Sequence, residues 1–266
     1  KARRSFGKAA ARYDETAVLQ HEIGRRMIER LDTMRVAPRR ILDIGCGTGV
    51  GTDALLRRYP KAEVIALDFA LPMLAHARRR GRWLRRPRCV CGDLDRLPLA
   101  AHSVDLVFAN AALQWSADPP DAFRGIARVL RPGGKLAFTS FETSAFQPML
   151  DDFVARLRAF DVQLPDGPFG SQRIASPEHC RELLAEAGLS SIDVQNLQLG
   201  YHLRDENDWW EVITSTAMRA LFEQVPADRQ DAFRQEHLAF VAGQKNENGL
   251  WLDVQTRFAS GVKAPR

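Results

Sequence analysis

The feature that most restricts the fold of this chain is an apolar run, at residues 39–49, that reaches a carboxylate and then three alternating glycines. The segment reads Arg-Arg-Ile-Leu-Asp-Ile-Gly-Cys-Gly-Thr-Gly. The apolar run predicts a buried strand, and residues 51–59 predict a helix whose first N–H groups lack partners within the helix. Because glycine has no Cβ, this backbone can pass close beneath a ligand. The pattern predicts a strand–turn–helix unit that binds a nucleotide-like cofactor.

The glycine spacing distinguishes this turn from two phosphate-binding loops. It is G-x-G-x-G, whereas dinucleotide folds use G-x-G-x-x-G, and no Lys follows Gly49 as it would in a P-loop. A carboxylate at Asp43 would repel a polyphosphate and attract the ammonium group of an amino-acid moiety. The turn therefore suits a ligand without a pyrophosphate. Taken alone, it also fits a tight strand-to-helix connection in any α/β fold.

Four further apolar runs, at 64–68, 89–93, 104–110 and 136–141, have polar residues at or near their ends. Ligands of open parallel sheets bind at the C-terminal ends of the strands. Asp68 lies 19 residues beyond Gly49, where a second strand would place an acid for ribose hydroxyls. Asp93 and Asn110 end the next two runs. The series predicts an α/β fold that gathers these side chains at one edge.

Over residues 36–142 these motifs resemble those of class I S-adenosylmethionine (SAM) dependent methyltransferases. The resemblance implies a Rossmann-like α/β fold, with a seven-stranded, mostly parallel sheet, helices on both faces and a helical lid. It implies N-terminal lid helices (1–35), a SAM-binding core (36–142), and a helical insertion with C-terminal strands that complete the sheet (143–266), all in one structural domain. The cofactor implied is SAM.

The resemblance also implies a set of cofactor-binding residues. The residues near the glycine turn would line the methionine end, and Asp68 would bind the ribose. Phe69 and Met73 would pack on the adenine. Asp93 and Leu94 would face the adenine amino group. Asn110 and Ala111 would close the methionine side, and Tyr13 would belong to a lid. The set is Tyr13, Asp43, Gly45, Cys46, Gly47, Asp68, Phe69, Met73, Asp93, Leu94, Asn110 and Ala111. Each acid could instead be a solvated loop residue, but position and order favour binding for Asp68 and Asp93.

Composition fits an ordinary soluble globular protein. The chain has 266 residues, 45% hydrophobic and 27% charged, and no apolar run approaches the roughly 20 residues that span a bilayer. No targeting segment is evident, so we expect a cytoplasmic protein. The four cysteines match neither a zinc site nor a disulfide framework, and the six histidines show no metal-ligand spacing. We therefore expect reduced thiols and no metal.

The net charge of +5 includes an arginine cluster between Arg78 and Arg88. It is either a solvated surface or a docking site for an acidic partner such as an acyl carrier protein. Nucleic acid is disfavoured as the substrate. Methyltransferases that act on the amino groups of bases carry the motif Asn/Asp-Pro-Pro-aromatic after the fourth strand. This chain instead has Asn110 followed by Ala-Ala-Leu.

Two segments suggest a substrate class. Residues 6–14, together with the glycine turn and the Asn-Ala-Ala-Leu-Gln-Trp at 110–115, resemble the malonyl-acyl-carrier-protein O-methyltransferases of biotin synthesis. The Gln-Trp pair also resembles trans-aconitate methyltransferases, and residues 208–214 are closer to their lid helix. Both resemblances imply methylation of a carboxylate oxygen. Gln114 and Trp115 are candidate pocket residues, although Trp115 would also suit core packing.

Carboxylate methylation makes few demands on side chains. A carboxylate is already ionised at neutral pH, so no general base is required and no catalytic residue is assigned. A cation should receive the substrate, and the sequence offers Arg156, Arg173, Arg204 and Arg219. A phenolic or carbon acceptor would instead draw attention to His21 or His202. The alternatives are a small-molecule O-, N- or C-methyltransferase and a non-catalytic binding module, which the intact glycines and strand-end acids disfavour.

The remainder of the chain predicts a helical lid. Helices are expected at 149–160, 177–187, 208–222 and 227–241, with Ser176 as an N-cap and Gly188 as a stop. Strands are expected at 192–197 and 250–262.

Overall fold

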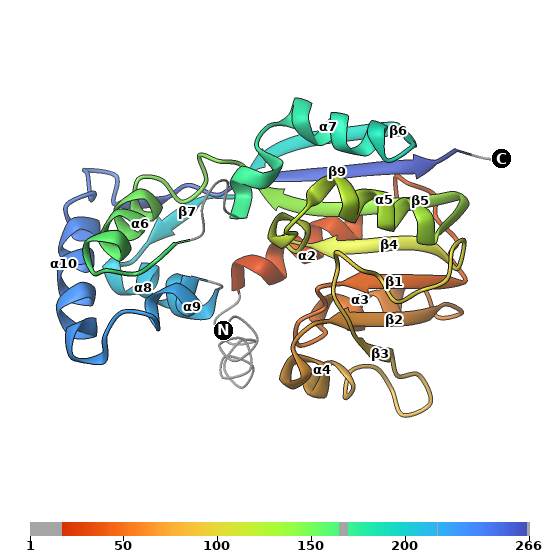
Figure 1. The fold of residues 1–266 in the computed structure, drawn as a ribbon, viewed down its shortest axis with the longest axis horizontal. Coiled ribbons are helices and arrows are strands. Elements are labelled where there is room, and N and C mark those ends of the chain that lie inside the picture. The colour runs from red at the N-terminus through yellow and green to blue at the C-terminus, as the bar shows by residue number, and fades with distance from the viewer. Residues whose placement is uncertain (1–17, 165–169, 217, 265–266) are drawn as a thin grey trace.

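The computed structural model describes residues 18–164, 170–216 and 218–264. Its main sheet has seven strands in the order β3-β2-β1-β4-β5-β9-β6 (Figure 1). The first five pair in parallel, and β9 runs antiparallel to both of its neighbours. This confirms the predicted seven-stranded, mostly parallel sheet. The strands are β1 (Arg40–Ile44), β2 (Glu63–Asp68), β3 (Arg88–Cys91), β4 (Val104–Asn110), β5 (Leu130–Phe141), β6 (Leu189–Gln198) and β9 (Gln255–Lys263).

Helices cover both faces of this sheet, because its central strands carry apolar side chains on both sides. On one face α2 packs beside α3, and on the other α5 packs beside α7. The helices of this part are α2 (Val18–Arg30), α3 (Val50–Arg58), α4 (Leu71–Ala77), α5 (Pro119–Val129) and α7 (Pro177–Glu186). The expected cap of α7 is confirmed: Ser176 Oγ accepts the N–H of His179 at 3.1 Å, and Gly188 follows the helix with φ +79°.

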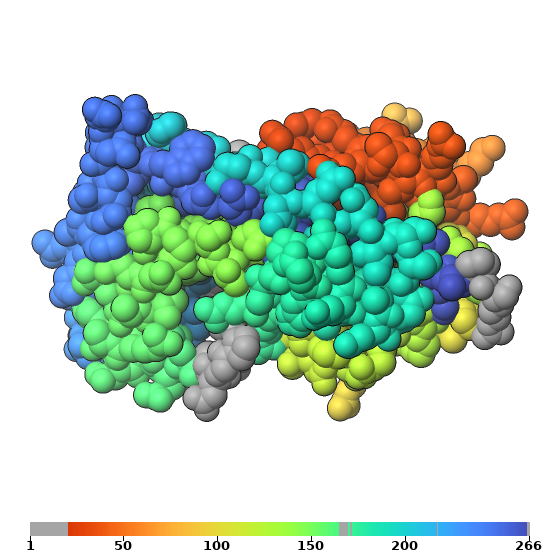
Figure 2. All heavy atoms as spheres, turned by 90° about the horizontal axis from the view of Figure 1, so that it is seen from above, coloured from red at the N-terminus to blue at the C-terminus, as the bar shows by residue number. Residues whose placement is uncertain are grey.

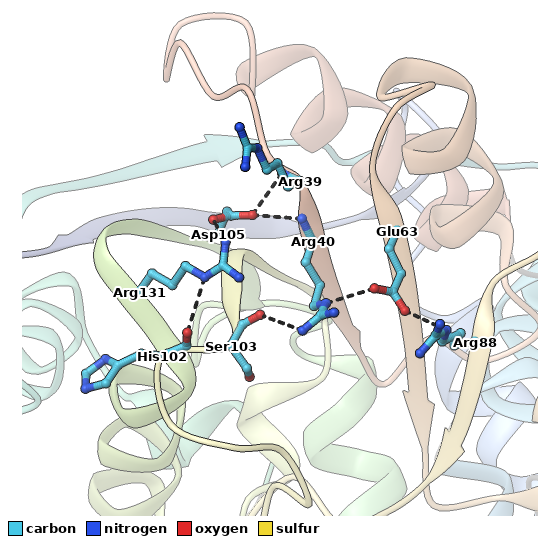
Figure 3. A network of polar contacts seen from close by, with 8 residues as sticks. All are labelled: Arg39, Arg40, Glu63, Arg88, His102, Ser103, Asp105 and Arg131. Atoms are coloured by element: carbon cyan, nitrogen blue, oxygen red, sulfur yellow. Dashed lines mark hydrogen bonds and ion pairs between the residues drawn. The ribbon is translucent and has the colours of Figure 1, made fainter.

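A polar network ties the strands together at the end remote from the glycine turn (Figure 3). Asp105 of β4 accepts the backbone N–H groups of Arg39 and Arg40, both at 2.8 Å. Glu63 of β2 lies between Arg40 and Arg88, whose Nε atoms are 2.8 and 2.6 Å from its carboxylate oxygens. Four neighbouring strands are thereby joined, which fixes their register and hence the relative heights of their opposite ends.

The lid is a second layer of helices beside the C-terminal ends of the parallel strands (Figures 1 and 2). It is built from α6 (Met149–Ala159), α8 (Glu206–Ser215), α9 (Met218–Phe222), α10 (Gln230–Ala242) and a two-stranded sheet of β7 (Tyr201–Leu203) and β8 (Leu250–Leu252). Edge-to-face aromatic pairs fill its core, with ring centroids 5.5 Å apart for Phe153 and Phe233 and 5.2 Å apart for Phe160 and Phe233. Among the residues described, no helix is long and apolar enough to cross a bilayer.

Two expected elements are wrong in their extent. The strand expected at 250–262 is interrupted at residues 253–254 and forms two strands; at the break Gln198 Oε1 accepts the N–H of Val254 at 3.0 Å. Residues 250–252 therefore join the lid sheet. The helix expected at 208–222 ends at Ser215, since Thr216 is extended and its hydroxyl both donates to Ile213 O (3.3 Å) and accepts from Met218 N (3.4 Å).

A buried histidine, His237 of α10, joins α8 and α6 within the lid. His237 Nε2 accepts from Trp209 Nε1 at 2.7 Å, and its Nδ1 lies 2.7 Å from Asp152 Oδ2. Indole nitrogen only donates, so the proton of neutral His237 is on Nδ1 and points to Asp152. Burial lowers the pKa of His237, with a smaller opposing effect from Asp152, which also pairs with Arg156. Protonation of Nε2 would break the contact with Trp209.

We expect acid to destabilise the protein through His237. The unfolded chain binds this proton near pH 6.5 and the folded chain only at lower pH, so the stabilisation is present above that pH and is lost as pH falls below it. Thermal unfolding followed by tryptophan fluorescence from about pH 7 to about pH 5 should show a steeper fall in Tm for the wild type than for His237→Gln. Equal slopes would contradict this account, and His202→Gln, altered at an exposed position, is the control.

Candidate active site

A cavity of about 800 Å³ lies between the C-terminal edge of the sheet and the lid. Its sheet wall contains every predicted cofactor residue that falls within the described ranges, together with Gln114 and Trp115. The residues are Asp43, Gly45, Cys46, Gly47, Asp68, Phe69, Met73, Asp93, Leu94, Asn110 and Ala111. Tyr13 lies outside the described residues. The structure thus brings the predicted set together, and its role in binding stays a prediction.

The glycine turn combines positive φ angles with close packing at its first glycine. Gly45 has φ +66°, and a Cβ added there would lie 2.5 Å from the Cβ of Ala112. The turn is fastened to the neighbouring strand, because Leu67 O accepts the N–H groups of Gly45 (2.8 Å) and Cys46 (3.0 Å). Gly47 has φ +55° and meets no protein atom within 4 Å of an added Cβ. The turn is therefore packed tightly at its start and open at Gly47, which lines the cavity.

Asp68 closes the turn from the end of β2. Its Oδ2 accepts the N–H of Gly47 at 2.9 Å, and its Oδ1 accepts the N–H of Ala70 at 2.8 Å. Burial raises the pKa of Asp68, while these backbone donors act in the opposite direction. Each carboxylate oxygen keeps a lone pair for a ligand hydroxyl. Asp68 can therefore order the turn and bind a diol at the same time.

Asp43 is the second buried acid of the cavity. It is 2% exposed, and its Oδ2 accepts the hydroxyl proton of Thr52 at 2.5 Å. Burial raises its pKa to about 7, with a further upward contribution from the negative charge of Asp68. A ligand ammonium group in the cavity would favour the ionised form and reverse this shift.

Binding of an α-amino ligand such as SAM should consequently depend on pH. With a pKa of about 7, Asp43 is about one-tenth ionised at pH 6 and one-half ionised at pH 7, so the Kd should fall about fivefold over that interval. Affinity should fall again above about pH 7.7, where an α-amino group loses its own proton. Calorimetric titrations in buffers of different ionisation enthalpy should also detect proton release. A profile that is the same in Asp43→Asn as in the wild type would contradict the assignment.

The fourth and fifth strands form the adjoining wall. Ala111, with φ +51°, directs its N–H to Thr139 Oγ1 at 2.9 Å, and that hydroxyl donates to Asn110 Oδ1 at 2.7 Å. Gln114 follows in the short helix η1 (Leu113–Trp115) and is 3% exposed. Within the described ranges its Oε1 has no hydrogen-bond partner, although it is buried. An unsatisfied buried amide oxygen at a cavity wall favours a polar ligand there.

The lid wall is mostly apolar but includes one unexpected arginine. Leu150, Val154 and Arg158 lie four residues apart on α6 and all line the cavity, while Phe153 and Leu157 of the same helix are buried in the lid core. No ion pair joins Arg158 to another residue in the ranges described. Other lining side chains of the lid and of the strand-five end are Phe141, Thr143, Phe146, Gln147, Leu164, Met218 and Leu221.

The four arginines proposed from the sequence do not line this cavity in the described part of the chain. Arg156 pairs with Asp152 and Glu236, Arg204 with Asp208, and Arg219 with Glu223. Arg173 donates to the carbonyl oxygen of Ser116. Sequence reasoning missed Arg158. Its signal was the spacing from Leu150 and Val154, which form a stripe next to the apolar core positions of the helix.

Comparison with known proteins agrees with this geometry. A family model described as a methyltransferase domain matches residues 42–138. A malonyl-(acyl-carrier protein) O-methyltransferase from Halorhodospira halophila is 57% identical over 139 residues, which are 52% of this chain and 47% of that protein. One from Gallionella capsiferriformans is 36% identical over 207 residues, 75% of this chain and 68% of that protein. The chain spans about half the length of the first of these relatives.

Solved structures show the same fold. The YcgJ protein of Bacillus subtilis has a TM-score of 0.62 at 22% identity, covering 91% of this chain and 100% of that one. Phosphoethanolamine N-methyltransferase 2 of Haemonchus contortus, solved in complex with S-adenosyl-L-methionine, has a TM-score of 0.55 at 20% identity, covering 91% of this chain and 53% of that one. With the strand order, the glycine turn and the relative matched over two thirds of its length, the chain belongs to the malonyl-(acyl-carrier protein) O-methyltransferase family, on a class I methyltransferase fold.

Proposed function

We propose that this protein transfers the methyl group of SAM to the free carboxylate of a malonyl thioester carried by an acyl carrier protein, a step of biotin synthesis. The observation that carries the proposal is that this cavity has two unlike walls. The sheet wall supplies the glycine turn and buried acids, and helix α6 of the lid supplies Leu150, Val154 and Arg158, together with Asp151. The names of the relatives support the malonyl substrate.

The sheet wall fits SAM. Gly47 leaves open space in which the amino-acid moiety of SAM would lie. Asp43 lines the same part of the cavity, and its carboxylate suits an ammonium group. Asp68 offers lone pairs to a ribose diol, and Phe69 with Met73 offers an apolar surface to adenine. When bound, SAM supplies a methyl group on a sulfonium, which a carboxylate oxygen can attack while the C–S electron pair passes to sulfur.

The chain's part in the reaction is then positioning. Arg158 would pair with the malonyl carboxylate and hold one oxygen in line with the methyl group, and Gln114 would meet a polar part of the substrate. The apolar lid residues would exclude water from the carboxylate. The methyl ester product has no charge, so its attraction to Arg158 is lost and release is favoured.

Two further parts of the proposal concern its setting. The carrier protein would be acidic and would meet the arginine cluster between Arg78 and Arg88. We also infer a cytoplasmic location, with which the four free cysteines, Cys46, Cys89, Cys91 and Cys180, are consistent.

The proposal is tested by incubating the protein with methyl-labelled SAM and separate acceptors. These are malonyl carrier protein, malonyl-pantetheine, trans-aconitate and a phenol. We expect label only in the malonyl thioesters, released by base as methanol. Label in trans-aconitate or the phenol alone would overturn the substrate assignment, and no label in any acceptor, with no binding of SAM, would overturn the enzyme assignment.

A further inference from the structure

Residues 78–88, from the end of α4 to the start of β3, carry seven arginines and no acid. Six of these arginines fall into two groups with different environments, and the seventh, Arg78, lies beside Cys89. One group holds the loop in place. Arg80 Nε donates to Thr48 O at 3.0 Å, Arg85 donates to Leu56 O at 3.3 Å, and Arg88 pairs with Glu63. The other group is Arg79, Arg82 and Arg86, which are exposed and form no ion pair with any residue in the described ranges.

The loop is built around a tight turn with an apolar tip. Arg85 N donates to Arg82 O at 2.7 Å, which leaves Trp83 and Leu84 as the two central residues of the turn. Their exposed fractions are 84% and 85%. A neighbouring Trp and Leu that are both this exposed are unusual on a surface that has no partner.

The base of this turn is rigid. Gly81 has φ +79°, and an added Cβ would lie 2.2 Å from the carbonyl oxygen of Arg85, so the position requires glycine. Its N–H donates to Asp53 Oδ1 of α3 at 3.0 Å. The exposed tip is therefore presented on an anchored base, which lowers the entropy cost of binding a partner.

The turn also connects to the cavity. A groove along α3 is lined by Val50, Ala54, Arg57 and Arg80, among others, and Val50 and Ala54 line the main cavity as well. Arg80 is part of the same loop as Trp83. A partner seated on the tip could therefore extend a flexible arm along α3 towards the glycine turn.

We propose that Trp83, Leu84, Arg79, Arg82 and Arg86, here called the Trp83 patch, form the docking surface for the acidic carrier protein. This inference rests on the proposed function. Charge complementarity identifies the partner. Three arginines that form no ion pair among the described residues flank the apolar tip in the sequence, and the segment contains no acid. Tryptophan and arginine are also the residue types that contribute most at interface centres.

The test compares two substrates that share the reacting group. For Trp83→Ala, and for Arg82→Glu combined with Arg86→Glu, kcat/KM should fall roughly tenfold or more with malonyl carrier protein and stay unchanged with malonyl-pantetheine. Added salt should weaken the wild-type reaction with the carrier more than that of the charge variant. Arg124→Glu, at an exposed position on α5, is the matched control and should change neither substrate. Tm values identify any variant that fails to fold, and Leu84→Ala then serves as the milder test.

The outcomes are distinct from those of the proposed function. If the wild type methylates neither malonyl substrate, the proposed function fails. If the wild type methylates both substrates, and the variants keep their kcat/KM with both or lose it equally with both, the docking surface is wrong. If the variants instead lose binding to anionic lipid vesicles while keeping their kinetics with the carrier, the patch serves a membrane surface and the proposal is overturned.

Discussion

Replacing Asp68 by alanine should weaken SAM binding about 100-fold, equivalent to about 2.7 kcal/mol. The carboxylate accepts the N–H groups of Gly47 and Ala70 and would also receive the ribose hydroxyls. Hydrogen bonds to a charged group contribute about 1.5–3 kcal/mol each, and the alanine variant leaves the two N–H donors without their acceptor. The loss therefore combines a disordered glycine turn with missing ligand contacts.

The measurement is a calorimetric titration with SAM, accompanied by Tm. Asp68→Asn keeps the size and one acceptor oxygen, so it should bind SAM with intermediate affinity. Asp121→Ala, which removes an exposed acid of α5, is the control and should bind as the wild type does. Normal SAM affinity in a folded Asp68→Ala protein would show that the cavity does not hold the cofactor in the way described.

Reversing the charge at Arg158 should have the second largest effect. Arg158→Glu should raise the KM for malonyl-pantetheine about 100-fold and leave the Kd for SAM within about twofold, while Arg158→Ala should raise the KM about tenfold. The difference arises because glutamate adds repulsion of the substrate carboxylate to the loss of the ion pair. The expected rise in KM for Arg158→Ala is smaller because Arg158 is exposed to solvent in the lid wall, where an ion pair is weak.

The control for this prediction is Arg204→Glu. Arg204 is also an arginine of the lid part of the chain, but it pairs with Asp208 and lies outside the cavity lining. It should leave both constants unchanged. If Arg204→Glu impairs turnover and Arg158→Glu does not, the substrate lies elsewhere in the lid.

The sheet and its ligand edge could be predicted from sequence because each depends on local patterns. A buried parallel strand is a short apolar run, and its C-terminal polar residue marks the ligand edge. Asp43, Asp68, Asp93 and Asn110 were found in this way, and the structure places all four at one cavity. The glycine turn could be predicted from local sequence, because glycine permits the positive φ angles found at Gly45, Gly47 and Gly49.

The lid was predicted less well because its structure depends on contacts between distant segments. The division of residues 250–262 follows from pairing with β7 and from the side chain of Gln198, neither of which is visible in the local pattern. The same holds for arginines. Whether an arginine faces the cavity or pairs with a carboxylate is decided by the fold. Arg158 was therefore missed, while Arg156, two residues away, was one of the four candidates.

The central claim is that the malonyl carboxylate accepts the methyl group, and intact-mass spectrometry of the carrier tests it most directly. After incubation of malonyl carrier protein with SAM and this protein, we expect the carrier to gain the mass of one methylene group on its malonyl arm, matched by one S-adenosylhomocysteine. Base should release the added methyl group as methanol, and Asp68→Ala should show little gain at a SAM concentration near the wild-type Kd. A carrier of unchanged mass, alongside a protein that binds SAM and methylates another acceptor, would contradict the account.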